Sequence, residues 1–427
     1  MLGLRLFLGS LLAVLFASNC AHSEGVVDRS TLSHKHVAGY QGWFNCPEDG
    51  GNSWHHWFRN KPDADALVVD LWPDLSGFEP EEVCQTGLKT SSGNEAKVFS
   101  SQFPSVVLRH FRWMREHDLD GAALQRFVIA LQSQEGQKRR DRVLHNVMRA
   151  SQSEGRAFFV MYDISGADPD RFVDTTLDDW RRLLESERLA GHPRYWHHGG
   201  KPVVAVWGLG FKGRPGSVDQ AKRLVAALRA TPGGVTLIGG VPTWWRTLSG
   251  DAKPEPGWAD VYAQFDIISP WSVGRYGDER SWKMHLVKAV EPDIEALALS
   301  GRGTSFMPVI FPGFSFRNGG GNDEARFDKI PRRCGEFYWM QARDLLKSGK
   351  VTMLYTAMLD EFDEGTAIIP VAESEEEMPR GAKLITRHQS GCAQPSDWYL
   401  QIAGRISGVL HGERDLLEKP LSSMFYR

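Results

Sequence analysis

The sequence predicts an α/β protein built as a single (β/α)8 TIM barrel with elaborated βα loops. Three observations predict this fold: short apolar segments resemble buried parallel strands, amphipathic helical segments alternate with them, and neither a linker nor an internal repeat divides the chain. With 427 residues, 41% of them hydrophobic, the chain can bury one large core. A doubly wound parallel sheet is the competing fold, because it alternates strands and helices in the same way.

Eight segments are predicted to form the barrel strands. Each is a short apolar run without strict alternation, which is typical of a strand covered on both faces. In chain order they are residues 36–44, 121–129, 157–162, 202–207, 235–239, 265–269, 305–311 and 351–357.

Helical periodicity fills most of the intervals between these strands. Val107, Phe111 and Met114 follow helical spacing in the first helical segment, and Ser217 is placed as the N-cap of another. The predicted helices are residues 104–117, 137–154, 177–189, 217–230, 281–299 with a break near Pro292, 336–346 and 396–410. Residues 67–96 show no clear period, so we expect a functional insertion there with short elements of its own.

The N-terminus predicts export. Arg5 precedes an apolar run over residues 6–17 that is too short for a membrane span, so residues 1–23 are predicted to be a signal peptide cleaved after Ser23. The second interpretation is lipoprotein anchoring at Cys20, which Asn19 disfavours. We therefore expect residues 24–427 to form one secreted or periplasmic domain without a transmembrane segment.

Four cysteines remain in the exported chain, and they allow three pairings. A disulfide between Cys46 and Cys84 is the expected bridge, because an exported protein meets oxidising conditions. The alternative is that Cys46, Cys84, Cys334 and Cys392 are four buried thiols.

Charge and motif content exclude several classes of protein. The net charge of -3 leaves no basic excess for nucleic acid. Residues 208–213 match GxGxxG, but Arg214-Pro215-Gly216 follows where a helix should run, and the next strand has no acid for a ribose. No GxSxG elbow is present. We therefore expect no cofactor, and we expect a monomer.

Paired histidines raise a metal hypothesis that the spacing does not support. The pairs are His34 with His36, His55 with His56, and His197 with His198, and none has the HExxH spacing of a zinc site. No cysteine cluster accompanies them. We therefore expect no metal.

Two glutamates are the candidate catalytic residues. Glu361 and Glu364 follow the last predicted strand, where the carboxyl ends of barrel strands place side chains at the mouth. Leu359, Phe362 and Ile368 surround them, and such apolar neighbours would raise the pKa of one carboxyl while the other stays ionised. That difference supplies an acid and a base at one pH, as glycosidic bond cleavage requires. The alternative is a pair of helix caps or solvated loop charges.

The chain also resembles a known family. DEFDEGTAIIP looks like the NEWxEGTxIEP-type motif of glycoside hydrolase family 99 and the related family 71, which include endo-acting α-mannosidases and α-1,3-glucanases. VAGYQGWFNCPED with the later WHHW, VVLRHFRWMREHDLDGAALQRF and VIFPGFSFRN resemble further segments of those enzymes, in order.

This resemblance implies a (β/α)8 glycoside hydrolase with a retaining mechanism on an α-linked oligo- or polysaccharide. Glu361 would be the base toward the sugar 2-hydroxyl and Glu364 the general acid and then base. The alternative function is a carbohydrate-binding barrel without catalysis, because Asp360 and Phe362 stand where the family has Asn and Trp, and Gln125-Arg126-Phe127 where it often has Ser-Trp-Tyr.

The expected substrate-binding residues are aromatic and polar side chains near predicted strand ends, since flat rings stack on sugars. They are Tyr40, Trp43, Trp54, His56, Gln125, Arg126, Asp163, Trp207, Trp245, Trp271, Arg317, Asn318 and Asp360.

Overall fold

A computed structural model describes residues 25–51, 53–391 and 393–419 of the chain. The predicted signal peptide, the cleavage site after Ser23 and the lipidation candidate Cys20 lie outside these residues. Within the described ranges, no helix combines the length and the apolar character needed to cross a membrane.

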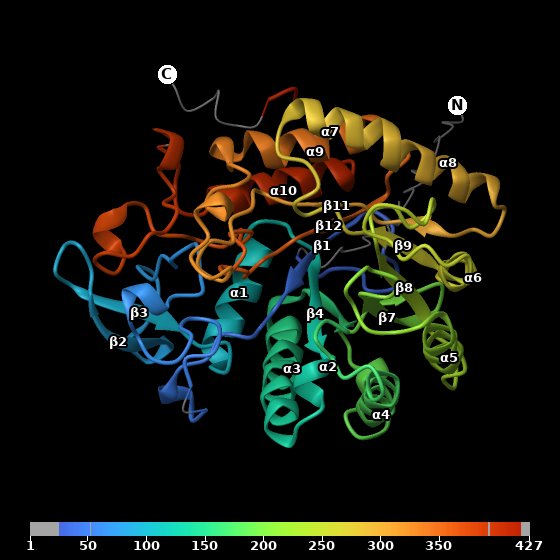
Figure 1. The fold of residues 1–427 in the computed structure, drawn as a ribbon, viewed down its shortest axis with the longest axis horizontal. Helices are drawn as coiled ribbons and strands as arrows, with labels where there is room; N and C mark the ends of the chain where they lie inside the picture. Colours follow the sequence, from blue (N-terminus) through green and yellow to red (C-terminus); the bar gives the residue numbers. More distant parts are fainter. Residues whose placement is uncertain (1–24, 52, 392, 420–427) are drawn as a thin grey trace, which may run out of the picture.

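A parallel sheet forms the centre of the molecule, and helices surround it (Figure 1). The order of its strands is β10-β9-β8-β7-β5-β4-β1-β12-β11, and neighbouring strands in this order are parallel. The strands are β1 Lys35–Tyr40, β4 Gly121–Phe127, β5 Ala157–Asp163, β7 Lys201–Trp207, β8 Thr236–Val241, β9 Ile267–Pro270, β10 Ser305–Phe306, β11 Val309–Ile310 and β12 Met353–Thr356.

The sheet closes on itself through one short stretch of chain. β10 pairs with β9, while β11, which follows after Met307 and Pro308, pairs with β12. The Met307 amide donates to the Ile268 carbonyl at 2.9 Å, and the Tyr355 amide donates to the Pro308 carbonyl at 3.0 Å. The two ends of the strand order are thus halves of the predicted seventh strand. This closure excludes the open, doubly wound sheet and confirms the (β/α)8 barrel.

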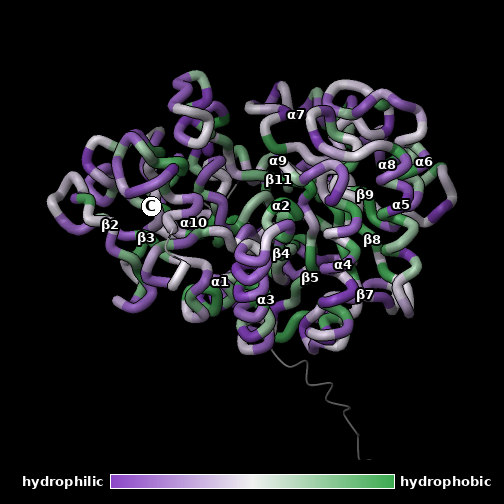
Figure 2. Tube along the Cα trace, turned by 60° about the horizontal axis from the view of Figure 1, so that its bottom comes forward, coloured by the Kyte–Doolittle hydropathy of each residue, from purple (hydrophilic) through white to green (hydrophobic). Residues whose placement is uncertain are grey.

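Helices between the strands cover the outside of the barrel. In Figure 2 the outer faces of α3 and α4 are hydrophilic and the strands behind them are hydrophobic, as a buried barrel requires. The helices are α1 Pro104–Glu116, α2 Val128–Leu131, α3 Gln134–Glu154, α4 Phe172–Glu185, α5 Val218–Arg229, α6 Gly257–Tyr262, α7 Glu279–His285, α8 Glu291–Leu299, α9 Glu336–Lys347 and α10 Trp398–Leu410. Ser217 caps α5 as predicted, because its side chain accepts from the Gln220 amide at 3.2 Å.

Several predicted boundaries are wrong by a few residues. The first strand ends at Tyr40 because the next two backbone amides bind a carboxylate instead of a strand, and Gly42 then turns at φ 54°. The second strand ends at Phe127 because Val128 begins α2. The third helix begins at Phe172, where two further apolar side chains are buried.

The helical segment over residues 281–299 is interrupted, as its proline predicts. A π-helical turn, Leu286–Val290, separates α7 from α8, and Pro292 is the second residue of α8.

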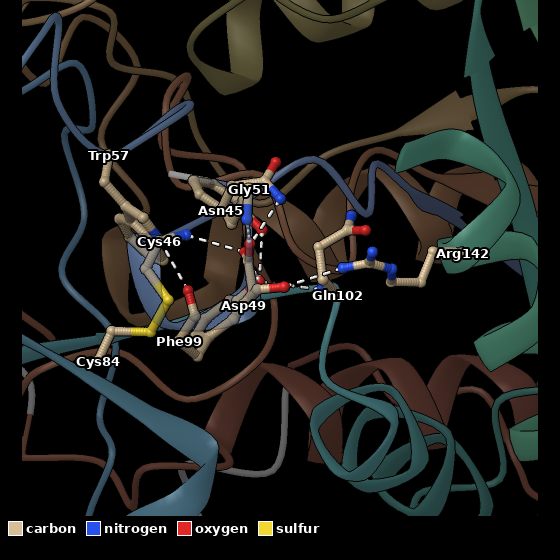
Figure 3. Close-up of a disulfide and its surroundings, with 11 residues drawn as sticks. Asn45, Cys46, Asp49, Gly51, Trp57, Cys84, Phe99, Gln102 and Arg142 are labelled. Atoms are coloured by element: carbon tan, nitrogen blue, oxygen red, sulfur yellow. Dashed lines mark hydrogen bonds between the residues drawn. A yellow bond between two sulfur atoms is a disulfide. The ribbon is translucent and has the colours of Figure 1, made fainter. Parts of the chain in front are cut away.

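The irregular insertion contains a hairpin that one disulfide ties to the first βα loop. β2 Val83–Lys89 and β3 Glu95–Phe99 pair antiparallel beside the barrel (Figure 1). Cys46 is bonded to Cys84, with 6.4 Å between the Cα atoms, which confirms the predicted pair (Figure 3). Cys334 is also disulfide-bonded, so the alternative of four thiols is wrong. Cys392 lies outside the described residues.

Candidate active site

A pocket of about 240 Å³ lies where the carboxyl ends of several barrel strands meet. β4 contributes Gln125 and Phe127, β5 ends at Asp163, and β7 ends at Trp207. The chain just after β1, β9 and β12 supplies further side chains. The full lining is Gln41, Trp43, Gln125, Phe127, Asp163, Ser165, Trp207, Arg214, Trp271, Met358, Glu361 and Glu364. The structure therefore brings both predicted catalytic glutamates into one pocket.

Glu361 is held from two sides. Its side chain is 5% exposed, and the amide nitrogen of Gln41 donates to its Oε1 at 3.0 Å while the Thr366 hydroxyl donates to its Oε2 at 3.0 Å. The backbone amides of Thr366 and Ala367 both donate to the Glu361 carbonyl, at 3.1 and 2.9 Å. One chain segment thus fixes both the backbone and the carboxyl group of this residue.

Glu364 is half-buried in the same pocket. Burial, followed by the nearby Asp363 charge, raises the pKa of Glu364 to about 7, and the Arg214 guanidinium opposes this increase. Burial also raises the pKa of Glu361 well above its usual value, and the Glu364 charge adds to this effect. Two carboxyl groups in one buried site do not both ionise easily, so the pair holds a proton near neutral pH.

Asp360 lies behind the pocket, not in its lining. This buried carboxylate accepts from the backbone amides of Gln41 at 2.7 Å and Gly42 at 2.9 Å, while Arg140 donates to the carbonyls of the same two residues at 3.2 and 3.4 Å. Burial raises the pKa of Asp360 to about 7. The residue therefore positions the turn that carries the Gln41 side chain to Glu361.

Phe362, the second departure from the family motif, is a core residue. It is buried, and its ring lies 5.6 Å from Phe44, 5.7 Å from Trp57 and 5.8 Å from Phe99 between ring centroids. These aromatic contacts pack the acid-bearing loop, which is the segment that carries Glu361 and Glu364, against the core.

His56 connects the aromatic wall of the pocket, formed by Trp43 and Phe127, to the acid-bearing loop. Its ring is stacked on Trp43 with centroids 3.8 Å apart, and Trp43 in turn stacks on Phe127 at 5.0 Å. Nδ1 of His56 lies 2.7 Å from Oδ2 of Asp363. Burial lowers the pKa of His56 and raises the pKa of Asp363, so the pair favours its uncharged form.

Trp207 and Trp271 form a second group of aromatic residues in the pocket lining. Their rings meet edge to face with centroids 5.3 Å apart, and Phe211 lies 4.8 Å from Trp207. The guanidinium of Arg214 lies over Trp207 at 5.6 Å from the ring centroid. A ring-shaped ligand can therefore contact aromatic surface and a cation on this side of the pocket.

Two other predicted residues line the pocket with polar groups. Gln125 donates to the Tyr355 hydroxyl at 3.2 Å, and Asp163 accepts from the Ser165 amide at 2.7 Å. Burial raises the pKa of Asp163.

The structure places Tyr40, Trp54 and Arg126 outside the pocket lining. Tyr40 is fully buried and its hydroxyl lies 3.0 Å from Nδ1 of His110. Trp54 packs edge to face on Phe58. Arg126 points out of the barrel, because successive residues of a strand face opposite sides, and it binds Asp179 of α4 at 2.6 Å and Asp141 of α3 at 2.9 Å.

Trp245, Arg317 and Asn318 also lie outside the lining. The Trp245 indole donates to Asp293 at 2.8 Å. Both Arg317 and Asn318 donate their backbone amides to the buried Asp70, at 2.7 and 2.8 Å. These contacts tie loops together and leave the three residues no position in this pocket.

Sequence reasoning did not single out Gln41, Ser165, Arg214, Met358 or Asp363 as site residues. For two of them the sequence position was a signal: Gln41 stands between Tyr40 and the turn at Gly42, and Asp363 stands between the two glutamates. Arg214 directly follows the glycine-rich motif of residues 208–213 and places a cation in the pocket lining.

One group of possible metal ligands exists among the described residues, and it is not at this pocket. It consists of Cys46, Glu48 and Cys84. The two cysteines are bonded to each other, so they offer no thiolate.

Fold and site together define a (β/α)8 barrel protein with a carboxylate pair in an aromatic pocket at the barrel mouth. Two structures of the GH99 endo-α-mannosidase from Bacteroides thetaiotaomicron are similar to it, each with a TM-score of 0.62 and 90% of this chain covered. One, in complex with bis-tris-propane, is 14% identical with 98% of its own chain covered, and the other is 15% identical with 99% covered. A glycoside hydrolase-like protein is also similar, with a TM-score of 0.54, 13% identity and coverage of 89% of this chain and 95% of its own.

No protein-family model matches the sequence, and no curated protein matches it. At these identities the structural likeness shows the fold, which agrees with the closure of the sheet.

Proposed function

We propose that this protein is a retaining glycoside hydrolase that cleaves an α-linked glycan, with Glu361 as the base toward the sugar 2-hydroxyl and Glu364 as the general acid and then base. The observation that carries the proposal is the position of these two carboxyl groups, one buried and one half-buried, in one pocket where they hold a proton near neutral pH. The fold likeness to glycoside hydrolase structures supports it.

The reaction divides into two steps. In the first, Glu361 takes the proton of the 2-hydroxyl, O2 bonds to C1 to give an epoxide-like sugar, and the bond from C1 to the leaving oxygen breaks as Glu364 donates its proton to that oxygen. In the second, the Glu364 carboxylate takes a proton from water, the water oxygen bonds to C1 as the bond from C1 to O2 breaks, and O2 recovers its proton from Glu361. Each step inverts C1, so the configuration is retained.

The surroundings of each glutamate suit its role. Hydrogen bonds from Gln41 and Thr366 favour the ionised form of Glu361, which a base needs, once Glu364 is protonated and no longer repels it. Burial raises the pKa of both carboxyl groups, but only Glu361 accepts these two hydrogen bonds among the described residues, so we assign the proton to Glu364, which an acid needs. Three pocket-lining residues each retain a buried polar atom without a hydrogen-bond partner among the described residues: Oε1 of Gln41, Oε1 of Gln125 and Nε1 of Trp207.

The testing experiment is a product assay. The purified protein is incubated with a panel of α-linked glycans, and released reducing ends are measured. On any cleaved substrate, Glu361→Gln and Glu364→Gln should each lower kcat by about 10² to 10⁴-fold while circular dichroism stays unchanged. Glu336→Gln, an exposed change at the start of α9, is the matched control and should keep full activity. Near-full activity in Glu364→Gln would refute the assignment.

The second candidate function is a carbohydrate-binding barrel without turnover. The departures at Asp360 and Phe362 motivate it, although both side chains lie behind the pocket. Glycan binding without released reducing ends would favour the binding protein, and turnover would exclude it.

We further propose that the protein works as a monomer outside the cytoplasm. The Cys46–Cys84 disulfide supports this location, because such bonds persist in oxidising compartments. Fractionation of the native host and size-exclusion chromatography with light scattering test the two statements.

A further inference from the structure

A second cavity, of about 20 Å³, lies apart from the glutamate pocket, where α10 meets the loops after β11 and β12. This volume accommodates one occupant of about the size of a water molecule. Leu71, Val371, Ile385 and Tyr399 are buried and close most of it. The remaining lining residues are Asp328, Arg332, Arg333, Cys334, Thr386, Arg387 and Gln389.

Arg332 brings a buried positive charge to this cavity. The residue is 9% exposed, its guanidinium lies 3.8 Å from the centroid of the Tyr399 ring, and one of its terminal nitrogens donates to the Ala367 carbonyl at 2.7 Å. Its Nε and its other terminal nitrogen have no partner among the described residues. Among the residues that the structure describes, no ion pair within 4.0 Å involves Arg332. Asp328, in the same cavity wall, carries the opposite charge without forming such a pair, and a buried charge that lacks a paired counter-ion is costly.

A second arginine contributes another unused donor. Arg387 has a side chain that is 7% exposed, and it pairs with Glu373 at 2.8 Å and Asp74 at 3.6 Å. Its Nε has no hydrogen-bond partner among the described residues. Asp328 is the lining carboxylate, and its Oδ2 accepts from Gln389 at 2.8 Å. The cavity wall therefore combines two buried guanidinium groups that each retain a free N–H.

We propose that this cavity binds a single halide-sized monovalent anion, chloride in physiological solutions, through the free N–H groups of Arg332 and Arg387. Water could accept the same hydrogen bonds, but it would leave Arg332 without a counter-ion in direct contact, because Asp328 forms no ion pair with it within 4.0 Å. A chloride ion is only slightly larger than water, accepts several N–H donors and brings a negative charge into contact with the guanidinium.

This site is connected to the acid-bearing loop. The arginine that faces the anion also donates to the Ala367 carbonyl, and the Ala367 amide donates to the Glu361 carbonyl. Occupancy of the cavity thus stabilises the segment that holds Glu361. The anion site stands independently of the proposed glycosidase activity, because it rests on contacts outside the pocket.

Thermal unfolding in matched salts tests the site. Protein freed of halide by dialysis is titrated with sodium chloride, bromide or gluconate at constant ionic strength, adjusted with gluconate. Chloride and bromide should raise the unfolding midpoint by about 2 to 4 °C in a saturable way, and gluconate should not. Arg332→Gln should abolish this response. Arg326→Gln, which removes an arginine that lies over Phe316 elsewhere, is the control and should retain it.

Crystals soaked in bromide provide a measurement that needs no variant. An anomalous peak in the cavity, within hydrogen-bond distance of Arg332, is the expected result. Equal midpoints in chloride and gluconate, or a cavity that holds only water in bromide, would overturn the proposal even if Arg332→Gln fails to fold. Since neither measurement uses turnover, failure of the glycosidase proposal leaves this result interpretable.

Discussion

Nδ1 of His56 lies 2.7 Å from Oδ2 of Asp363, and the same imidazole ring is stacked on Trp43 at 3.8 Å. His56 has a backbone φ of 64°, a left-handed conformation that is uncommon for a residue other than glycine. The stacking on one face of the ring and the Nδ1 contact at its edge hold it in place. One histidine thus connects the aromatic wall of the pocket to the loop that carries both glutamates.

Replacing Asp363 by asparagine should change the pH dependence of the reaction. In its ionised form Asp363 raises the pKa of Glu364, so the asparagine, which cannot ionise, should lower that pKa and move the alkaline limb of kcat/KM to lower pH. The amide can still bind His56, so Trp43 should stay in place. A pH-rate profile of Asp363→Asn on a cleaved glycan is the measurement. Glu375→Gln, on the exposed acidic loop, is the control, and an unchanged limb in Asp363→Asn would contradict the coupling.

The unmodified protein should lose activity as the pH rises through about 7. The general acid must carry its proton, and Glu364 with a pKa of about 7 is protonated below that pH and ionised above it. Above the pKa, kcat/KM should fall about tenfold per pH unit. Activity that stays constant to pH 9 would show that another group donates the proton.

Conversion of Glu361 or Glu364 to glutamine should stabilise the protein in alkaline solution. Because the folded pKa of Glu364 is raised from 4.5 to about 7, its burial favours folding below about pH 4.5 and destabilises the folded state increasingly as the pH rises to 7. The glutamine variants remove that destabilisation. We expect unfolding midpoints a few °C above wild type at pH 8 and nearly equal midpoints at pH 4.5. Calorimetry at both pH values, with Glu336→Gln as the control, measures the difference.

The sequence predicts the barrel and its acid pair well because both depend on local patterns. Eight apolar runs correspond to the barrel strands, and the strand end before Glu361 places this residue at the mouth. Cys46 and Cys84 were paired on the expectation that the chain is exported, and the structure contains this bond. Predicted strand boundaries are wrong where a side chain takes the hydrogen bond of a backbone amide. The Gln41 amide is an example, because it donates to Asp360 from a distant part of the chain.

The rest of the pocket depends on side-chain direction, which a single sequence does not fix. Gln125 and Arg126 were both expected to face substrate, yet neighbours on a strand point to opposite sides. Trp271 lines the pocket whereas Trp245 bonds to Asp293, although both follow strands. Arg214 was hidden in a loop whose glycines suggested another kind of site.

Truncation of the tryptophan wall should weaken substrate binding more than catalysis. Trp207 and Trp271 offer flat surface in the pocket, so Trp207→Ala should raise KM by about tenfold or more, since stacking on an aromatic ring contributes about 0.5 to 1.5 kcal/mol beyond area burial. Trp245→Phe, which changes an indole outside the pocket, should leave KM unchanged. Steady-state kinetics and isothermal titration with Glu364→Gln protein separate the two effects. An unchanged KM in Trp207→Ala would remove this wall from the binding site.

The Cys46–Cys84 bond should stabilise the insertion beside the barrel through the loop that it closes. The two cysteines are 38 residues apart, and closing such a loop destabilises the unfolded chain by about 4 kcal/mol. Cys46→Ala, Cys84→Ala and the double variant should therefore lose similar amounts of unfolding free energy, because either change breaks the same bond. Denaturant unfolding under non-reducing conditions makes the comparison. If the two single losses instead add up in the double variant, the cysteines contribute as separate buried side chains, and the bond carries no stability of its own.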